Sequence, residues 1–323
     1  MKYYIGCDLG GTNLRAGLVD PQCGAVSCLM STPTLAREGH VAVMTRMASL
    51  FQRLIAASGF SKDDIGGIGI GVPGVLDLER GLTILLPNFP GNWPEVPLRD
   101  TLQGALGIPV HLLNDVRSIT YGEWRFGAGR GVQDMACFAI GTGIGGGLVI
   151  NGRLHLGIGG TAGELGHQVI DFNGPLCGCG NHGCVEVYAS GPAIANLGVK
   201  AVMQGLTTSI GSLANYDLNR ITPELIAQAA QQGDPIACDI YQKAGEYIGI
   251  AAANVCVSVG PRRIVIAGGV AQAGDLLLNP IRRTLKERVR VMPVDQVEVA
   301  CAELGGNAGV VGVAMWASSG GVG

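Results

Sequence analysis

The stretch from Gly163 to Glu186 constrains the fold of this chain more than any other. It reads GELGHQVIDFNGPLCGCGNHGCVE and holds His167 followed by Cys177, Cys179 and Cys184. Three thiolates and one imidazole complete a tetrahedral zinc site, and such a closed set leaves no open position for chemistry. Glycines between the cysteines let the backbone fold tightly around one point. The spacing therefore predicts a structural zinc ion that braces this bend.

Two other interpretations of the cysteines remain open at this point. Two of them could form a disulfide, or all three could be buried thiols without a partner. Cys177 and Cys179 are too close in sequence for an unstrained bridge between them. If the metal is present, it holds the flanking carboxylates Glu164 and Glu186 in fixed positions. His167 would bind zinc through one ring nitrogen and keep the other for a neighbour, such as the molecule that the carboxylates bind.

Bulk composition excludes several classes of protein. The chain has 323 residues, of which 47% are hydrophobic and 15% charged, so it is long enough for two compact domains. A formal net charge of -3 argues against a nucleic-acid surface. We expect no signal peptide and no membrane contact, because no apolar run is long enough to span a bilayer. Ten cysteines without an export signal favour a reducing compartment, the cytoplasm.

The pattern of strand, glycine turn, strand occurs twice. Residues 3–8 and 14–20 flank the first turn, and residues 135–140 and 146–150 flank the second. After the first pair, apolar patterning predicts a third strand at 25–31, a helix at 40–58 and a strand at 65–72. A helix at 98–106 and a strand at 110–113 follow. Helices are expected later at 190–204, 222–232, 235–257, 276–290 and 308–317, with strands at 263–267 and 297–301. This alternation predicts an α/β sheet in each half.

The first glycine turn carries groups suited to phosphate. The segment comprises Asp8, Gly10, Gly11, Thr12 and Asn13. Backbone N–H groups in such a turn can approach an anion closely, because glycine has no Cβ in the way. A carboxylate beside phosphates is unfavourable unless a cation intervenes, and hydrated Mg²⁺ meets that need. The alternative is an ordinary hairpin turn.

Two later glycine segments extend this hypothesis. Gly141, Thr142 and Gly143 form a second loop in the equivalent place, so the two loops could clamp a triphosphate. The alternative is glycine required by close strand packing. Gly268 and Gly269 follow a buried strand, where bare backbone could accommodate an adenine or a ribose. Taken alone, this third segment favours a simple strand-to-helix turn.

Other polar residues suit a hydroxylated acceptor. Asn114 and Asp115 lie where a strand passes into a helix, so Asp115 either caps that helix or is a general base. The phosphate loops favour the base, since they need a group that activates the acceptor. Fixed carboxylates and amides, here Glu164, Glu186 and Asn88, suit the directional hydroxyls of a polyol. Alternatively, Glu186 begins a helix and Asn88 belongs to a turn.

With these residues assembled, the chain resembles the ROK family of sugar kinases and sugar-sensing repressors over nearly its whole length. The resemblance rests on DLGGTN near the start, GVPG at residues 71–74, Asn114-Asp115, GTGIGGG, GELGH and CGCGNHGCVE. It implies an α/β, duplicated actin-like ATPase (ribonuclease H-like) fold with two lobes around a cleft. We expect a smaller lobe from residues 1–117 plus 306–323, and a larger lobe, 118–305, with the zinc-binding insertion.

The resemblance also implies an activity and residue roles. It implies an ATP-dependent hexose kinase that phosphorylates the 6-hydroxyl of glucose, with Mg²⁺, a structural Zn²⁺ and a homodimeric assembly. Asp115 would be the catalytic base, and Zn²⁺ would bind His167 and the three cysteines. Sugar contacts are implied for Asn114, Glu164, His167 and Glu186.

Two alternatives remain. The first is a kinase of the same family acting on mannose or an N-acetylhexosamine, because the lining of the 2-position pocket cannot be located from sequence. The second is a sugar-sensing regulator without catalysis. Family repressors carry a helix-turn-helix segment ahead of the kinase-like part. Because the phosphate loop begins at Asp8, we expect no such segment here.

Overall fold

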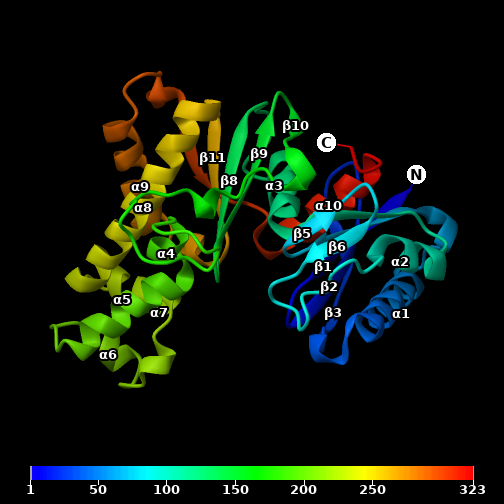
Figure 1. Ribbon diagram of the computed structural model, residues 1–323, viewed down its shortest axis with the longest axis horizontal. Coiled ribbons are helices and arrows are strands. Elements are labelled where there is room, and N and C mark those ends of the chain that lie inside the picture. Colours follow the sequence, from blue (N-terminus) through cyan, green and yellow to red (C-terminus); the bar gives the residue numbers. More distant parts are fainter. Residues whose placement is uncertain (1, 323) are drawn as a thin grey trace. The chain divides into compact units, whose positions relative to one another are not determined.

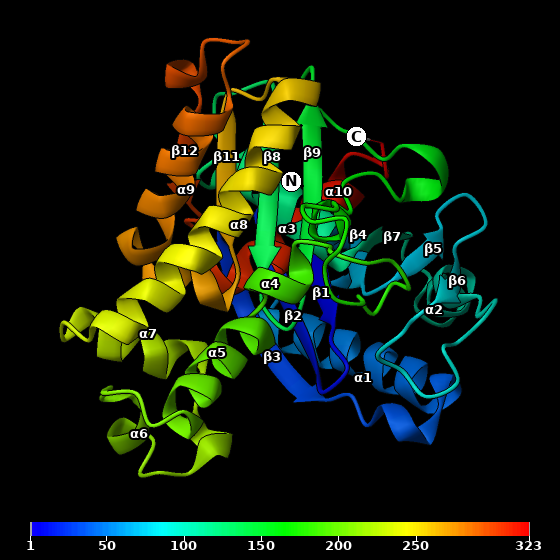
Figure 2. The ribbon, with the colours of Figure 1, turned by 60° about the vertical axis from the view of Figure 1, so that its left-hand side comes forward.

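Two five-stranded sheets with the same strand order organise the molecule. A computed structural model describes residues 2–322, and Figures 1 and 2 show its ribbon in two views. The first sheet has the order β3-β2-β1-β4-β7. Its strands are β1 (Tyr3–Leu9), β2 (Asn13–Val19), β3 (Val26–Pro33), β4 (Ile65–Val72) and β7 (Val110–Asn114). The hairpin strands β1, β2 and β3 are antiparallel, whereas β4 runs parallel to both β1 and β7.

The second sheet repeats this plan in the order β10-β9-β8-β11-β12. Its strands are β8 (Met135–Ile140), β9 (Ile144–Ile150), β10 (Arg153–Leu154), β11 (Arg263–Ala267) and β12 (Glu298–Cys301). Again the first strand is followed by a hairpin, and β11 runs parallel to β8 and β12. Counted from its own first strand, each sheet reads 3-2-1-4-5. The duplication expected from the recurring glycine turns is confirmed.

Glycines in β4 set the spacing of the layers in the first sheet. Ile68, Ile70 and Val72 alternate with glycines, and these larger side chains join the core formed with α1 (His40–Ser58) and α2 (Leu98–Leu106). The opposite face packs against α10 (Ala308–Ser318). A Cβ at Gly69 would lie 1.9 Å from the carbonyl oxygen of Val313 in α10, so only glycine permits this approach. Figure 1 shows α1 and α2 side by side against this sheet.

Two long helices of the second unit also pack closely against each other. Helices α8 (Pro235–Val259) and α9 (Asp275–Arg288) lie side by side in Figure 2. A Cβ at Gly245 would lie 2.8 Å from the carbonyl oxygen of Leu277 in α9. The smaller helices are α4 (Glu186–Ala189), α5 (Gly191–Met203), α6 (Ile210–Leu213) and α7 (Pro223–Gln231).

Most of the expected elements are confirmed. The helices at 40–58 and 98–106 and the strands at 65–72, 135–140 and 263–267 have the limits that the sequence predicted. The helix expected at 190–204 is preceded by a separate turn of helix, α4, because Ser190 has extended backbone angles between α4 and α5. A short antiparallel hairpin of β5 (Val75–Asp77) and β6 (Leu82–Leu85) follows β4.

The chain divides into two compact units whose limits differ from the expected lobes. The first comprises residues 1–131, 147–163 and 303–323, and the second comprises 132–146 and 164–302. We expected the first lobe to end at residue 117, but α3 (Asp115–Phe126) packs directly on α10. A Cβ at Gly312 of α10 would lie 1.7 Å from the carbonyl oxygen of Ser118 in α3. This contact places the whole of α3 in the first unit.

Among residues 2–322, no helix combines the length and the hydrophobicity that crossing a lipid bilayer requires.

Asp234, the N-cap of α8, gives a test of this architecture. Burial alone would raise the pKa of its carboxyl, but bonds from Ala237 N, Ser209 N and the Ser209 and Thr208 hydroxyls lower the pKa to about 2. The stability this gives is present above about pH 4 and is lost as the pH falls towards 2. We expect Asp234→Asn to lower the free energy of unfolding by about 2 kcal/mol at pH 7.

Urea unfolding at pH 7 and pH 2.5 measures this difference. Asp217→Asn is the matched control, because Asp217 is an exposed cap of a single short turn. A pH-independent effect of Asp234→Asn would contradict the electrostatic account.

Candidate functional site

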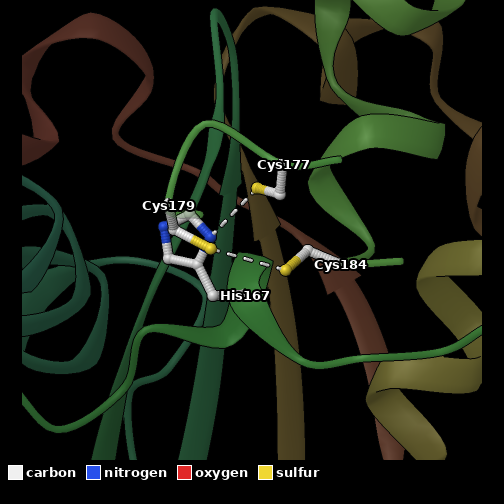
Figure 3. A group of neighbouring side chains, drawn as sticks. All are labelled: His167, Cys177, Cys179 and Cys184. Atoms are coloured by element: carbon white, nitrogen blue, oxygen red, sulfur yellow. Dashed lines mark hydrogen bonds between the residues drawn. The ribbon is translucent and has the colours of Figure 1, made fainter. Parts of the chain in front are cut away.

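The four metal-binding side chains expected from the sequence converge in the second unit. One ligand atom from each of His167, Cys177, Cys179 and Cys184 lies within 4.8 Å of the others. The His167 Nδ1 to Cys177 Sγ distance is 3.7 Å, and so is the Cys179 Sγ to Cys184 Sγ distance (Figure 3). Sulfur ligands of a tetrahedral zinc ion, at about 2.3 Å from the metal, lie about 3.8 Å apart. The group therefore has the chemistry and nearly the geometry of a structural zinc site.

Backbone hydrogen bonds fold the bend into this arrangement. Val185 N donates to Gln168 O at 2.9 Å, which brings the segment after Cys184 beside the segment after His167. Cys177 N donates to Asn181 O at 2.7 Å and closes the turn that carries Cys179. The approach requires glycine, because a Cβ at Gly183 would lie 1.6 Å from the Asp171 carbonyl oxygen.

The thiols show why a cation belongs here. Cys177, Cys179 and Cys184 are free cysteines, so the disulfide alternative is not realised. Burial raises the pKa of the Cys184 thiol to about 12. A thiol of this kind ionises when a metal displaces its proton, so the donor set is suited to a cation that binds thiolate strongly.

The two carboxylates expected beside the metal differ in their surroundings. Glu164 precedes the short turn Leu165–His167, and its side chain is exposed. Glu186 begins α4, as the alternative interpretation held, and its Oε2 accepts a 2.8 Å hydrogen bond from Ile144 N at the start of β9. Its Oε1 lies 3.8 Å from Cys177 Sγ. The bend thus links the metal ligands to the end of the second glycine loop.

A pocket of about 390 Å³ lies between the second and third glycine segments. It is lined by Gly141, Thr142, Gly191, Pro192, Ala195, Ile221, Thr222, Pro223, Glu224, Gly269 and Val270. A Cβ at Gly268 would lie 2.2 Å from the Ile140 carbonyl oxygen, so Gly268 permits a close approach to β8. Sequence reasoning found the glycines but missed the walls from α5 and α7. Thr222 and Pro223 mark a helix start, but nothing in the sequence places that start at the pocket.

Hydrogen bonds from one threonine fix the first glycine turn. Gly10 N donates to Asn13 O at 3.0 Å, which makes the segment a hairpin turn. Thr34 holds this turn, because its N–H donates to Thr12 O and its hydroxyl donates to Gly10 O at 2.6 Å. Gly11, like Thr12 and Asn13, stays exposed and open to a ligand.

A groove of about 710 Å³ runs past this turn in the first unit. It is lined by Gly11, Thr12, Leu35, Ala36, Arg37, Glu38, Pro87, Asn88, Phe89 and Pro90. The structure thus brings Asn88 to the first glycine turn. Sequence reasoning missed Arg37, since an exposed arginine in a loop carries no local signal.

Asp8 and Asp115 influence each other across the first sheet. Burial, followed by the nearby Asp115 carboxylate, raises the pKa of Asp8, and Arg15 lowers it, with a result of about 6. Asp8 is the last but one residue of β1 and Asp115 follows β7, both at carboxyl ends of strands that flank β4. A divalent cation at this place would offset the repulsion between the two carboxylates.

The helix cap at this junction belongs to Asn114, not to Asp115. Asn114 Oδ1 accepts hydrogen bonds from Val116 N at 3.0 Å and Arg117 N at 3.2 Å. Its Nδ2 donates to Gly74 O at 3.1 Å, which ties the GVPG turn to α3. Asn114 therefore has a structural role that sequence reasoning did not assign. Asp115 is the first residue of α3, and its Oδ1 also accepts from Val116 N at 2.9 Å, so its carboxylate contributes to the same helix start.

Comparison with known proteins identifies the family. A sequence model of the ROK family matches residues 4–319. The chain belongs to the ROK family. It is 33% identical to a glucokinase of Halalkalibacterium halodurans over 96% of this chain and 93% of that protein. It is 34% identical to a xylose repressor of Caldicellulosiruptor bescii over 76% of this chain and 61% of the repressor.

A solved structure supports the same relation. A ROK family glucokinase from Streptomyces griseus, in complex with glucose and AMPPNP, matches with a TM-score of 0.81 at 32% identity. The match covers 97% of this chain and 98% of that one. The fold is the duplicated actin-like ATPase fold, as the resemblance implied.

The metal tetrad predicts the zinc content of the protein. We expect purified protein to contain about one zinc ion per chain, and Cys184→Ser to lose most of it, because a closed site needs all four ligands. Inductively coupled plasma mass spectrometry measures this. The exposed Cys23 supplies the control Cys23→Ser, which should keep its zinc. Full zinc in Cys184→Ser would contradict the assignment.

Because the pKa of Asp8 is raised, removing its charge should stabilise the folded protein, whereas removing the charge of Asp234 should destabilise it. Since the folded-state pKa of Asp8 is about 6, against 3.8 unperturbed, its carboxyl lowers stability progressively from about pH 4 and by the full amount above about pH 6. We expect Asp8→Asn to raise the free energy of unfolding by about 1–3 kcal/mol at pH 7.5 without Mg²⁺ and nucleotide. The gain should vanish near pH 4.

Urea unfolding in EDTA measures this gain. The exposed Asp63 gives the control Asp63→Asn, which should change stability little. A loss of stability in Asp8→Asn at pH 7.5 would contradict the account.

Proposed function

We propose that this protein is an ATP-dependent glucokinase, which transfers the γ-phosphoryl group of ATP to the 6-hydroxyl of glucose. The observation that carries the proposal is the similarity to glucokinases over nearly the whole chain. The geometry within each unit is consistent with it. The second unit has a pocket between two glycine segments, and the first has paired carboxylates beside a glycine turn.

The nucleotide would be bound by residues of both glycine loops. The pocket of the second unit has flat apolar walls from Pro192, Ile221 and Pro223, which suit a purine. Glu224 at the same pocket offers acceptors for ribose hydroxyls. Phosphates would be held by backbone N–H groups of the segments Gly10–Asn13 and Gly141–Gly143, apart from those of Gly10 and Gly141, which close the turns. Gly268 and Gly269 would lie at the nucleoside end. Mg²⁺ beside Asp8, when bound, neutralises charge on the phosphates.

The chemical step would depend on a single base. Asp115 would accept the proton of the 6-hydroxyl as that oxygen attacks phosphorus, which fits its place at the start of α3. Sugar hydroxyls would be oriented by a set of polar side chains. The set comprises Asn88, Asn114, Glu164, His167 and Glu186. Exclusion of water around the bound sugar limits hydrolysis of ATP.

The metal, the assembly and the location complete the proposal. Zn²⁺ on His167 and the three cysteines would be structural. We also propose a homodimer, because Phe172 and Leu176 on the zinc bend are exposed apolar side chains, 83% and 64% accessible, of the kind that self-association covers. Free cysteines favour a reducing location, the cytoplasm.

One alternative function has a specific observation in its favour, and another stays within the same chemistry. The similarity to xylose repressors extends over 76% of this chain, which is compatible with a sugar-sensing regulator. A mannose or N-acetylhexosamine kinase would use the same machinery with another sugar. Coupled measurement of ADP release with glucose, mannose, fructose, allose and N-acetylated sugars separates these possibilities. The proposal requires glucose to give the highest kcat/KM, and no turnover with any sugar would favour the regulator.

The role of Asp115 gives a sharper test. We expect Asp115→Asn to lower kcat about 10²–10⁴-fold, because a general base contributes about that factor. The glucose dissociation constant should change little, since the amide keeps the size of the side chain. Steady-state kinetics and calorimetric glucose titration measure the two effects, and Asp100→Asn on the exposed part of α2 is the control. Substantial turnover in Asp115→Asn would remove the base from the mechanism.

A further inference from the structure

The zinc bend and the second glycine loop contact each other directly within the second unit. Ile144, at the end of this loop, donates its N–H to Glu186 Oε2 at 2.8 Å. The carbonyl of the same residue faces Gly166, where a Cβ would lie 1.8 Å from the oxygen. The N–H and the carbonyl of Ile144 therefore both contact the bend, residues 164–186. The N–H meets Glu186 at one end of this segment, and the carbonyl meets Gly166 near the other.

This contact matters because the loop cannot fix its own conformation. Gly141 and Gly143 have no side chains, so the backbone between them has many accessible conformations. An internal hydrogen bond from Gly141 N to Gly143 O, at 2.9 Å, closes the turn. Its orientation is then set at its ends, where Gly191 N donates to Gly141 O at 2.8 Å and Ile144 N donates to Glu186. Glu186 is thus one of two anchors of this loop.

The anchor at Glu186 is strong for two reasons. Ile144 is 2% exposed, so its amide needs a protein acceptor to offset its burial. The acceptor is a carboxylate, and hydrogen bonds to ionised groups are stronger than those between neutral groups. The fit is also close, because a Cβ at Gly143 would lie 2.4 Å from Glu186 Oε2.

We propose that Glu186 is a positioning residue for the nucleotide, through which the zinc bend holds the second glycine loop in its phosphate-binding form. The inference rests on the proposed function, in which this loop binds the ATP phosphates. It assigns the two oxygens of one carboxylate to different tasks. Oε2 holds the loop, and Oε1, which lies 3.8 Å from Cys177 Sγ, would also contact the sugar, so one side chain joins the sites of both substrates.

The metal enters through the place of Glu186 in the chain. Cys184 lies two residues before Glu186, and Cys177 Sγ lies 3.8 Å from Glu186 Oε1. His167 follows Gly166, which contacts the carbonyl of Ile144. A metal that joins His167 to Cys184 therefore fixes both ends of the bend where they contact the loop.

Nucleotide affinity without sugar separates this role from sugar binding. AMPPNP with Mg²⁺ is titrated calorimetrically into wild type, Glu186→Gln and Glu186→Ala, with no sugar present. We expect Glu186→Ala to bind about 10-fold or more weakly, because a charge-assisted bond to a buried amide is lost. Glu186→Gln should lie between, since its amide oxygen still accepts from Ile144. Equal AMPPNP affinity in all three proteins would overturn the proposal.

A pair of glycine variants tests the same contact from the loop side. Gly143→Ala places a methyl group against Glu186 Oε2 and should weaken AMPPNP binding. Gly178→Ala in the bend is the matched control, because its Cβ would meet open space. If Glu186→Ala does not fold, the Gln and Gly143→Ala variants decide, and wild-type affinity in both would overturn the proposal. Failure of the wild type to bind AMPPNP would instead overturn the proposed function.

Zinc removal completes the test. Stripping zinc from the wild type should weaken AMPPNP binding, and adding zinc should restore it. In Glu186→Gln, zinc removal should lower AMPPNP affinity by a smaller factor, because the hydrogen bond from Ile144 to residue 186 is already weaker in this variant. An equal loss of affinity in both proteins would show that the metal acts on the loop without Glu186, and would overturn this route.

Discussion

Convergence of four metal-binding atoms is the constraint on which the candidate site depends. His167 and the three cysteines come from a segment with little regular structure, yet their ligand atoms gather within 4.8 Å. The bend has short hydrogen-bonded contacts of its own, such as Val185 to Gln168, but no long helix or strand. The proposed zinc ion would supply the rigidity that so short a segment lacks, and would fix the positions of Glu164, His167 and Glu186.

Glycine has a second, independent role in this molecule, which is to permit close approach. Gly69 allows α10 to contact the first sheet, and Gly268 allows the third glycine turn to contact β8. Similarly, Gly166 allows the bend to contact Ile144. At these positions the space of a Cβ is taken by neighbouring backbone, so the absence of a side chain serves packing. The exposed glycines, such as Gly11, are the ones open to a phosphate. Glycines that look alike in sequence thus fall into two groups, those that permit packing and those whose exposure suits the proposed phosphate binding.

The sequence predicted the fold well because its signals are local. Strand β4 and helix α1 were found with their limits, since apolar runs end there at Pro73 and Gly59. The sequence also predicted that His167 and the three cysteines converge, because their residue types and spacing define the chemistry of a metal site. In contrast, the roles of Glu224 and Arg37 depend on which segments meet in space. For the same reason, the boundary expected at residue 117 differs from that of the compact unit, which continues to residue 131. Helix α3 packs on α10 through contacts that no local pattern reveals.

X-ray absorption at the zinc edge of the purified protein tests the central claim most directly. A closed tetrad of one imidazole and three thiolates predicts a first shell of three sulfur atoms at about 2.3 Å and one nitrogen at about 2.0 Å. A shell made only of oxygen and nitrogen would contradict it, because the cysteines would then not bind the metal.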